Sequence, residues 1–363
     1  MTLSALFEGV STGNYKAQAA WFKYGTSQSN LNKTVYSDDL PYTTDGQFTA
    51  EALSLSPETK YYFKAYMSVW SEEQGKYVDI ESPIGSFTTA KQTKMAYQNG
   101  WLELPALRGD EDYFGYFYGS SGTSDDDRNY SYNYSYHRFA SLWTAYQLKY
   151  EHKSGSASTS SWYYNPNIDE KYQVNMTGNS YPTMYGASNY SKGHQCPSAD
   201  RKSNDLMNKQ TYYCTNQTPQ IQTGFNQGIW SSLEDAERSL VTRAGEVVYV
   251  VTGPVYSKEG ENEEITYFDA VSGKDAYPAK VPRPNYYWKA FLKVKWDGNT
   301  VESASAIGFW FEHKTYSGDK YSNYAVSVNK IEEWTGFDLF ANLPDSIENT
   351  AESNTDWTTF SNF

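Results

Sequence analysis

The sequence predicts an all-β sandwich followed by an α+β domain that is rich in strands and has few helices. The 363 residues are enough for two or three domains of about 100 to 200 residues each. Aromatic residues make up 17% of the chain, more than disordered chains carry, which indicates sizeable cores. Short alternating runs separated by turn residues fill the first 90 residues, whereas buried strands and amphipathic helices follow.

Residues 1–90 are expected to form the sandwich. The period-two runs, separated by Gly, Ser, Asn and Asp, cover residues 19–24, 47–55, 60–70 and 84–88. Between Leu53 and Tyr66 the chain contains the pattern Leu-x-Pro-x-Thr-x-Tyr, and Gly85-Ser-Phe-Thr-Thr89 follows. These stretches resemble the late strands of a fibronectin type III domain. The resemblance implies a spacing or adhesion module with a surface or glycan partner.

A polar junction at residues 90–94 leads into the second domain, residues 96–363. Its expected strands cover residues 101–104, 113–118, 141–150, 246–256, 286–296 and 304–313. An amphipathic helix is expected over Ser327–Thr335, with Gly336 as its stop.

Two polar stretches of this domain allow a functional interpretation, but a structural one is favoured. Residues 119–127 are turn formers and acids, and they are expected to be a solvated loop instead of a calcium loop. The Tyr/Ser/Asn alternation at residues 129–136 could offer a stacking platform for bases, but a half-buried strand is favoured.

The net charge argues against a general cationic coat for nucleic acids. Lys and Arg number 30 against 43 Asp and Glu, which gives −13. The acidity is uneven, because residues 187–243 hold six basic and five acidic side chains. No apolar run approaches the roughly 20 residues of a membrane span. The start lacks an export signal, so we expect a mature fragment of a secreted, cell-surface or periplasmic protein.

A helix with two distinct faces is expected near residues 226–240. Apolar residues form its core stripe, namely Ile229, Leu233, Ala236 and Leu240. The adjacent stripe carries an amide, an acid and a guanidinium: Asn226, Trp230, Glu234 and Arg238. The alternative interpretation of this stripe is a solvated face with one i, i+4 ion pair, which contributes only a few tenths of a kcal/mol.

One of the four histidines has a chemical context. His194 follows Gly193 directly and precedes a break at Pro197, so it lies near a strand end. Together with an amide, an acid and a guanidinium it supplies what phosphodiester hydrolysis needs: a base for water and positive charge for the leaving oxygen and the phosphate. The other three are expected to be structural: His137, His152 and His313, the last at the surface or at a strand end.

Three stretches together carry a resemblance to a known family. They are Gly193-His194, Asn216-Gln-Thr-Pro-Gln220 and the run from Asn226 to Glu234, with Arg238 four residues later. They resemble the DNA/RNA non-specific endonuclease family of the ββα-metal (His-metal finger) superfamily. Val251-Thr-Gly-Pro254 and Ile331-Glu-Glu-Trp-Thr-Gly336 extend the resemblance across the second domain.

The resemblance implies a mixed or antiparallel sheet and a Mg²⁺-dependent endonuclease, with Mn²⁺ as the alternative ion. Such an enzyme hydrolyses DNA, RNA or both and leaves a 5′-phosphate and a 3′-hydroxyl. His194 would be the general base and Asn226 the direct protein ligand of the ion. Glu234 would organise metal-bound water, Arg238 would stabilise the transition state, and Asn216 would hold the active-site loop.

Two positions depart from the family pattern. Lys192 stands where the family usually has an arginine, so bidentate phosphate geometry is lost. A second family arginine would fall near Ser160, which carries no charge. Lys192 and Arg201 are therefore the expected substrate-binding cations, with Arg138 and Arg283 as further candidates. The departures motivate an alternative, a surface adhesion or nucleic-acid-binding protein with an inactive nuclease domain.

The two cysteines flank the expected site. Cys196 lies two residues after His194, and Cys214 lies two residues before Asn216. The sequence leaves open whether they form a disulfide or two buried thiols. A zinc site would need a fourth ligand that the neighbouring sequence does not offer.

Overall fold

The computed structural model describes residues 2–7, 17–37, 47–52, 55, 59–89, 101–109, 111–119, 128–176, 190–270 and 280–363. The chain falls into two compact units. Unit 1 comprises Met1–Thr93, Arg108–Asp110 and Lys258–Asn262, and unit 2 comprises Lys94–Leu107, Glu111–Ser257 and Glu263–Phe363. Within the described ranges, no helix is long and apolar enough to cross a membrane.

Three expectations fall on residues outside this description. They are the polar junction at residues 90–94, most of the Leu-x-Pro-x-Thr corner, and the acidic loop at residues 120–127. Each stays a prediction.

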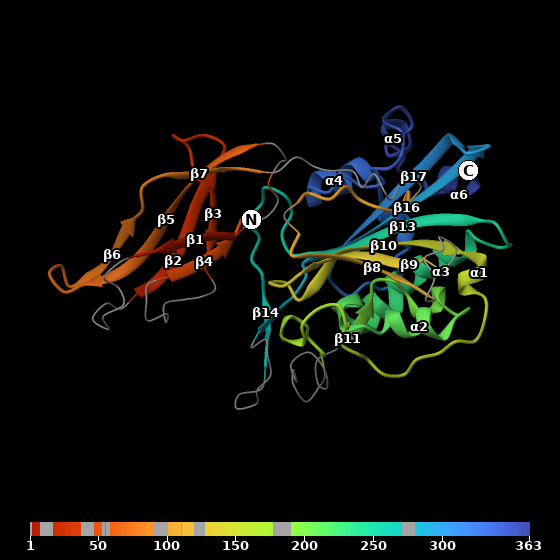
Figure 1. The fold of residues 1–363 in the computed structure, drawn as a ribbon, viewed down its shortest axis with the longest axis horizontal. Coiled ribbons are helices and arrows are strands. Elements are labelled where there is room, and N and C mark those ends of the chain that lie inside the picture. Colours follow the sequence, from red (N-terminus) through yellow and green to blue (C-terminus); the bar gives the residue numbers. More distant parts are fainter. Residues whose placement is uncertain are drawn as a thin grey trace. The chain divides into compact units, whose positions relative to one another are not determined.

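Unit 1 consists of two antiparallel sheets that share one core (Figure 1). One sheet pairs β1 with β4, and the other has the order β3-β2-β5-β6 with β7 also paired to β5. The strands are β1 Thr2–Leu6, β2 Ala17–Gly25, β3 Lys33–Tyr36, β4 Gln47–Glu51, β5 Lys60–Ser71, β6 Lys76–Glu81 and β7 Gly85–Thr88. The described part of this unit is thus the all-β sandwich expected, while its fibronectin type III identity stays a prediction.

The period-two pattern explains the core of unit 1. Along β5 the buried residues include Ala65, Met67 and Val69, which alternate with less buried neighbours. They pack with Leu3 of β1 and Phe48 of β4, so both sheets contribute to one apolar interior.

Unit 2 is built on a seven-stranded antiparallel sheet with the order β18-β17-β16-β13-β10-β9-β8. Its strands are β8 Tyr113–Tyr118, β9 Arg128–Ser135, β10 Ala140–Lys149, β13 Val247–Val255, β16 Tyr286–Asp297, β17 Thr300–Glu312 and β18 Ala325–Val326. With the helices described below, this confirms the predicted α+β class. The run at residues 129–136 is a strand, but both of its faces are buried, so its tyrosines cannot stack on bases.

Helices cover both faces of this sheet (Figure 1). On one face lie α4 Val328–Thr335, which ends at Gly336 as expected, and α5 Asp345–Ala351. On the other lies α3 Ser231–Ser239. Because β16 sends Ala290 to one core and Phe291 to the other, the strand is apolar on both sides. The remaining helices are α1 Tyr150–Lys153, α2 Asp205–Thr211 and α6 Trp357–Asn362.

One expected strand is absent. Residues 101–104 form a turn in which the Leu104 amide donates to the Trp101 carbonyl over 3.1 Å. The apolar side chains of this stretch are buried, and Glu103 between them forms an ion pair with Arg128. The apolar residues at 101–104 thus indicated burial correctly, but the predicted strand was wrong.

Two short antiparallel pairs complete unit 2. β14 Tyr267–Asp269 pairs with β15 Lys280–Pro282, and β11 Tyr190–His194 pairs with β12 Gln217–Ile221. Short 3₁₀ turns lie at Glu170–Tyr172, Ser198–Asp200, Cys214–Asn216 and Tyr321–Tyr324. An irregular wide-turn segment, Gln222–Trp230 (η7), connects β12 to α3. The paired strands β11 and β12, with α2 between them in the chain, and the helix α3 form a ββα segment.

Candidate active site

The ββα segment places His194 at the end of β11, opposite Gln217 of β12. The residue before it is a glycine for a steric reason. A Cβ at Gly193 would lie 2.2 Å from Cδ and Oε1 of Gln220, which is nearly fully buried. The Gly-His pair therefore allows the Gln220 side chain to lie across β11 next to the histidine.

One pocket of about 260 Å³ gathers four of the predicted site residues. Lys192 and His194 come from β11, Asn226 from η7 and Glu234 from α3. The rest of the lining is Pro197, Ser198, Ala199, Gln227 and Ser231. In the described part of the chain, Arg238, Asn216 and Arg201 do not line it.

His194 packs against two aromatic rings. Its ring centroid lies 4.7 Å from that of Trp162 and 4.7 Å from that of Tyr212. Burial lowers the pKa of His194 to about 4, so the imidazole is neutral at neutral pH. Among the described residues, nothing forms a hydrogen bond with its Nε2. This nitrogen is buried and unpaired, so a water molecule or a substrate oxygen in the pocket would satisfy it.

Asn216 holds the loop that follows His194. Its Oδ1 accepts from the Cys196 amide over 2.9 Å, and its Nδ2 donates to the Cys196 carbonyl over 2.9 Å and to the Thr211 carbonyl over 2.8 Å. The Asn216 carbonyl accepts from the Gln195 amide over 3.0 Å. Because Asn216 is fully buried, its role in this arrangement is to position the loop.

Asn226 lies in η7 and not on the helix. Thr223, Gly224, Gln227 and Gly228 have non-helical backbone angles, so the expected helical stripe begins only in α3. Asn226 Nδ2 donates to Oε1 of Gln220 over 2.5 Å. Within the described ranges Oδ1 takes part in no hydrogen bond, and this leaves an amide oxygen at the pocket wall for a cation.

Glu234 is a carboxylate whose charge is poorly compensated. Burial raises its pKa to about 7, while the ammonium of Lys289 opposes this shift. Its nearest ionic partner is Nη1 of Arg238, at 4.0 Å from Oε2. A cation bound in the pocket would favour the ionised form of Glu234.

Arg238 makes ion pairs with acids beside the pocket. Nη1 lies 3.0 Å from Oδ1 of Asp200, and Nη2 lies 2.7 Å from Oδ1 of Asp235. Burial opposes its charge, but these carboxylates outweigh burial and raise the pKa of Arg238. The guanidinium is therefore occupied in this arrangement.

Arg201, expected to bind substrate, is buried away from the pocket in the structure. It is fully buried, its Nε donates to Oδ1 of Asn129 over 2.5 Å, and its Nη2 donates to the Asn129 carbonyl over 2.7 Å. Its guanidinium also lies 5.0 Å from the ring of Tyr146. These bonds make it a core residue that ties β9 to the loop after Asp200.

A buried ion pair lies beneath α3. Nζ of Lys289, from β16, is 2.9 Å from Oε2 of Glu237, and both side chains are fully buried. The Tyr146 hydroxyl donates to the other carboxylate oxygen of Glu237 over 2.8 Å. The sequence does not predict this pair, because Glu237 belongs neither to the apolar stripe of the helix nor to the stripe that carries Glu234 and Arg238.

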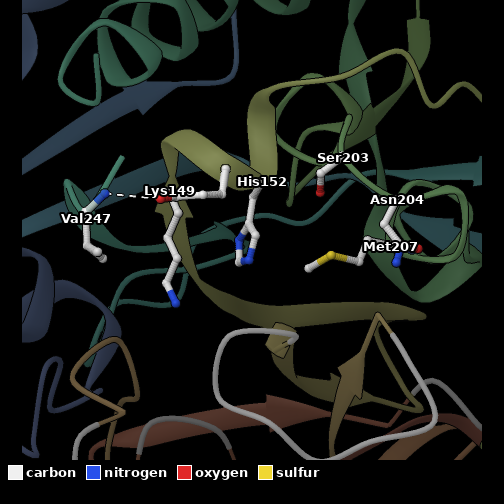
Figure 2. A pocket seen from close by; sticks show the side chains of 8 residues that line it. Lys149, His152, Ser203, Asn204, Met207 and Val247 are labelled. Atoms are coloured by element: carbon white, nitrogen blue, oxygen red, sulfur yellow. Dashed lines mark hydrogen bonds between the residues drawn. The ribbon is translucent and has the colours of Figure 1, made fainter. Parts of the chain in front are cut away.

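The other histidines lie outside this pocket. His313 is buried, not at the surface: Nε2 accepts from the Ile221 amide over 2.9 Å, and Nδ1 lies 2.9 Å from the Pro284 carbonyl. His152 lines a separate pocket of about 630 Å³ with Lys149, Ser203 and Asn204 (Figure 2).

The cysteines are two buried free thiols, the second of the two alternatives left open by the sequence. Burial raises the pKa of each thiol to about 12. Both therefore stay protonated at neutral pH and behave as apolar core groups.

The donor set suits a hydrated divalent cation. Mg²⁺ keeps several waters and binds few protein oxygens, and the Asn226 amide with the Glu234 carboxylate offers such a set in one pocket. In the described ranges, no three His, Cys, Asp or Glu side chains gather as a metal site.

Comparisons with known proteins place the chain in a family. Residues 113–346 match the DNA/RNA non-specific endonuclease family. The chain is 29% identical over 235 residues to "Nuclease 1, mitochondrial" of Schizosaccharomyces pombe, covering 62% of this chain and 70% of that protein. It is 30% identical over 223 residues to "Nuclease" of Serratia marcescens, covering 61% of this chain and 76% of that protein.

A solved structure of the EndoG/EndoGI complex has a similar fold. It aligns with a TM-score of 0.50 at 19% identity and covers 63% of this chain and 87% of the other. The family match spans more than half of the chain and includes the whole ββα segment. The chain therefore belongs to the DNA/RNA non-specific endonuclease family and is a nuclease.

Proposed function

We propose that the protein is a Mg²⁺-dependent endonuclease that cleaves DNA, RNA or both without sequence selectivity, with Mn²⁺ as the alternative ion. One observation carries the proposal: His194, whose buried Nε2 has no hydrogen-bond partner among the described residues, shares a pocket with Asn226 and Glu234. The similarity to proteins named as nucleases supports the same reaction.

In this proposal His194 is the general base. Its neutral imidazole accepts a proton at Nε2 from the water that attacks phosphorus. The bond from phosphorus to the 3′-oxygen breaks, so the products carry a 5′-phosphate and a 3′-hydroxyl. Asn216 keeps the loop after His194 in place during this step.

Asn226 would be the sole direct protein ligand of the cation, and Glu234 would organise the water bound to it. When bound, Mg²⁺ supplies positive charge beside the leaving oxygen. Lys192, which lines the pocket, would bind a substrate phosphate. Arg238 would stabilise the transition state by exchanging one of its carboxylate partners, Asp200 or Asp235, for phosphate oxygens.

The partner of unit 1 and the location of the protein remain proposals. We propose a surface or glycan partner for the sandwich, and secretion or display at the cell surface or in the periplasm. The net charge of −13 supports export, because it limits nonspecific adhesion. Fractionation of the native host, with the protein detected by antibody, tests the location.

Cleavage assays test the reaction. Plasmid DNA and RNA are incubated with the wild type in Mg²⁺ or EDTA, and with His194→Ala. We expect cleavage by the wild type in Mg²⁺ only, and a loss of about 10²- to 10⁴-fold in the variant. The exposed His137 provides the control, since His137→Ala should cleave as the wild type does.

Two results would contradict the proposal. Intact substrates after incubation with the wild type and Mg²⁺ would favour an adhesion or binding protein with an inactive domain. Equal cleavage by His194→Ala would exclude His194 as the base.

A further inference from the structure

Aromatic side chains pack against His194, which lines the catalytic pocket. The rings of Trp162 and Tyr212 both contact His194, and their centroids lie 5.2 Å from each other. Both side chains are partly exposed. A strand whose phosphate reaches His194 therefore passes next to aromatic surface.

Lysines lie over the same aromatic segment. Nζ of Lys192 is 5.5 Å from the ring centroid of Trp162, and Nζ of Lys209 is 4.7 Å from that of Tyr163. Tyr163 is 39% exposed. Rings interleaved with cations are typical of proteins that bind single strands, because bases stack on the rings and phosphates pair with the lysines.

Backbone hydrogen bonds fix this aromatic segment in place. The Tyr163 amide donates to the Tyr212 carbonyl over 3.0 Å, and the Cys214 amide donates to the Tyr163 carbonyl over 2.8 Å. The segment thereby forms a parallel bridge with Tyr213. A surface fixed in advance loses little conformational entropy when a ligand binds.

Lys192 favours an anionic ligand. Its Nζ donates to the neutral Oδ1 of Asn175 over 3.3 Å, and in the described part of the chain no carboxylate pairs with it. Burial lowers its pKa, which shows that the ammonium is incompletely solvated. A phosphate of a bound strand would supply the missing negative charge.

Three positions considered for phosphate binding offer no unpaired guanidinium in this structure. Arg201 is buried, Arg238 is paired with acids, and Ser160 carries no charge. Stacking on the aromatic rings can supply additional binding affinity, but only for bases that are not already stacked inside a duplex.

We propose that Trp162, Tyr163 and Tyr212, with Lys192 and Lys209, bind unpaired nucleobases beside the scissile phosphate, so that single-stranded nucleic acid is preferred over duplex. This preference rests on the proposed nuclease function, since it concerns the substrate of the same site.

Equilibrium binding tests the proposal independently of cleavage. The full chain is titrated in EDTA against fluorescein-labelled oligothymidylate and against a labelled hairpin duplex, with fluorescence anisotropy as the readout. The variants are Trp162→Leu, Trp162→Phe and Tyr163→Leu. Tyr150→Leu is the matched control, because Tyr150 is 38% exposed and lies 5.8 Å from Nζ of Lys153, outside the catalytic pocket.

The wild type should bind oligothymidylate more tightly than the hairpin. Trp162→Leu and Tyr163→Leu should each weaken oligothymidylate binding about 10-fold, within the range for loss of one stacked base, and leave hairpin binding unchanged. Trp162→Phe should retain most of the affinity, and Tyr150→Leu all of it.

Three outcomes would overturn the proposal: equal wild-type affinity for both probes, equal losses for both probes, or no loss in either leucine variant. Loss of cleavage by Trp162→Leu with unchanged binding would show that the ring only orients His194. Failure of the nuclease function itself would appear separately, as no wild-type cleavage in Mg²⁺.

Discussion

Gln220 fixes the orientation of the Asn226 amide by accepting a hydrogen bond from Asn226 Nδ2 over 2.5 Å. With Nδ2 committed, Oδ1 is the end that can bind a cation. Gln220 lies on β12 and Asn226 on η7, so the bond also ties the irregular segment to the hairpin.

Replacing Gln220 should therefore weaken metal binding. Gln220→Leu removes the acceptor and lets the Asn226 amide turn, so the Mg²⁺ concentration for half-maximal cleavage should rise about 10- to 100-fold. The measurement is a Mg²⁺ titration of initial rates on plasmid DNA. Gln222→Leu, two residues away, is the control, and an unchanged Mg²⁺ requirement in Gln220→Leu would show that the bond does not orient the ligand.

A side chain at position 193 should collide with Gln220. Gly193→Ala places a Cβ 2.2 Å from Gln220 Cδ and Oε1, so we expect a loss of about 1 to 3 kcal/mol in the free energy of unfolding, measured with urea. Adding Gln220→Ala removes the colliding atoms. The double variant should lose less than the sum of the single losses, whereas strict additivity would exclude the collision.

Acid should destabilise the protein through its buried histidines. The pKa of both His194 and His313 is lowered from about 6.5 to about 4 by burial, so the unfolded chain binds protons that the folded chain does not. Stability is then full above about pH 6.5 and falls as the pH drops towards 4.

Removing one of these histidines should reduce that loss. Between pH 7 and pH 5, His194→Gln should lose less unfolding free energy than the wild type by on the order of 1 to 2 kcal/mol. Urea unfolding at both pH values provides the measurement, with His137→Gln as the exposed control. An equal pH dependence in His194→Gln and the wild type would contradict the burial of a neutral imidazole.

Removing one partner of the buried ion pair under α3 should lower the free energy of unfolding strongly, whereas replacing both partners with apolar residues should not. Lys289→Met leaves the fully buried Glu237 without its counter-ion, so unfolding should become easier by about 3 to 5 kcal/mol. Lys289→Met combined with Glu237→Leu should recover most of this loss. If the loss of unfolding free energy in the double variant equals the sum of the losses in the two single variants, Lys289 and Glu237 are not energetically coupled.

Regular elements and the place of His194 near a strand end could be predicted from the sequence because their signals are local. The helix at Val328–Thr335 has a Ser327 cap and a Gly336 stop, and the structure shows both. His194 stood out because its glycine neighbour and the break at Pro197 are adjacent in the chain.

The remaining features depend on distant residues. Arg201 is buried because Asn129, distant in the chain on β9, accepts a hydrogen bond from its guanidinium. Trp162 reaches His194 although 31 residues separate them along the chain. Asn226 lies off the helical stripe because Gln227 and Gly228, between it and α3, have non-helical backbone angles.

The most direct measurement of the central claim is the Mg²⁺ titration of initial cleavage rates for Asn226→Ala against Gln227→Ala, two neighbours that line the same pocket. If Asn226 holds the cation, Asn226→Ala should need at least about 10-fold more Mg²⁺ or lose activity altogether, and Gln227→Ala should match the wild type. A wild-type titration curve for Asn226→Ala would contradict the assignment of this pocket as the metal-dependent catalytic site.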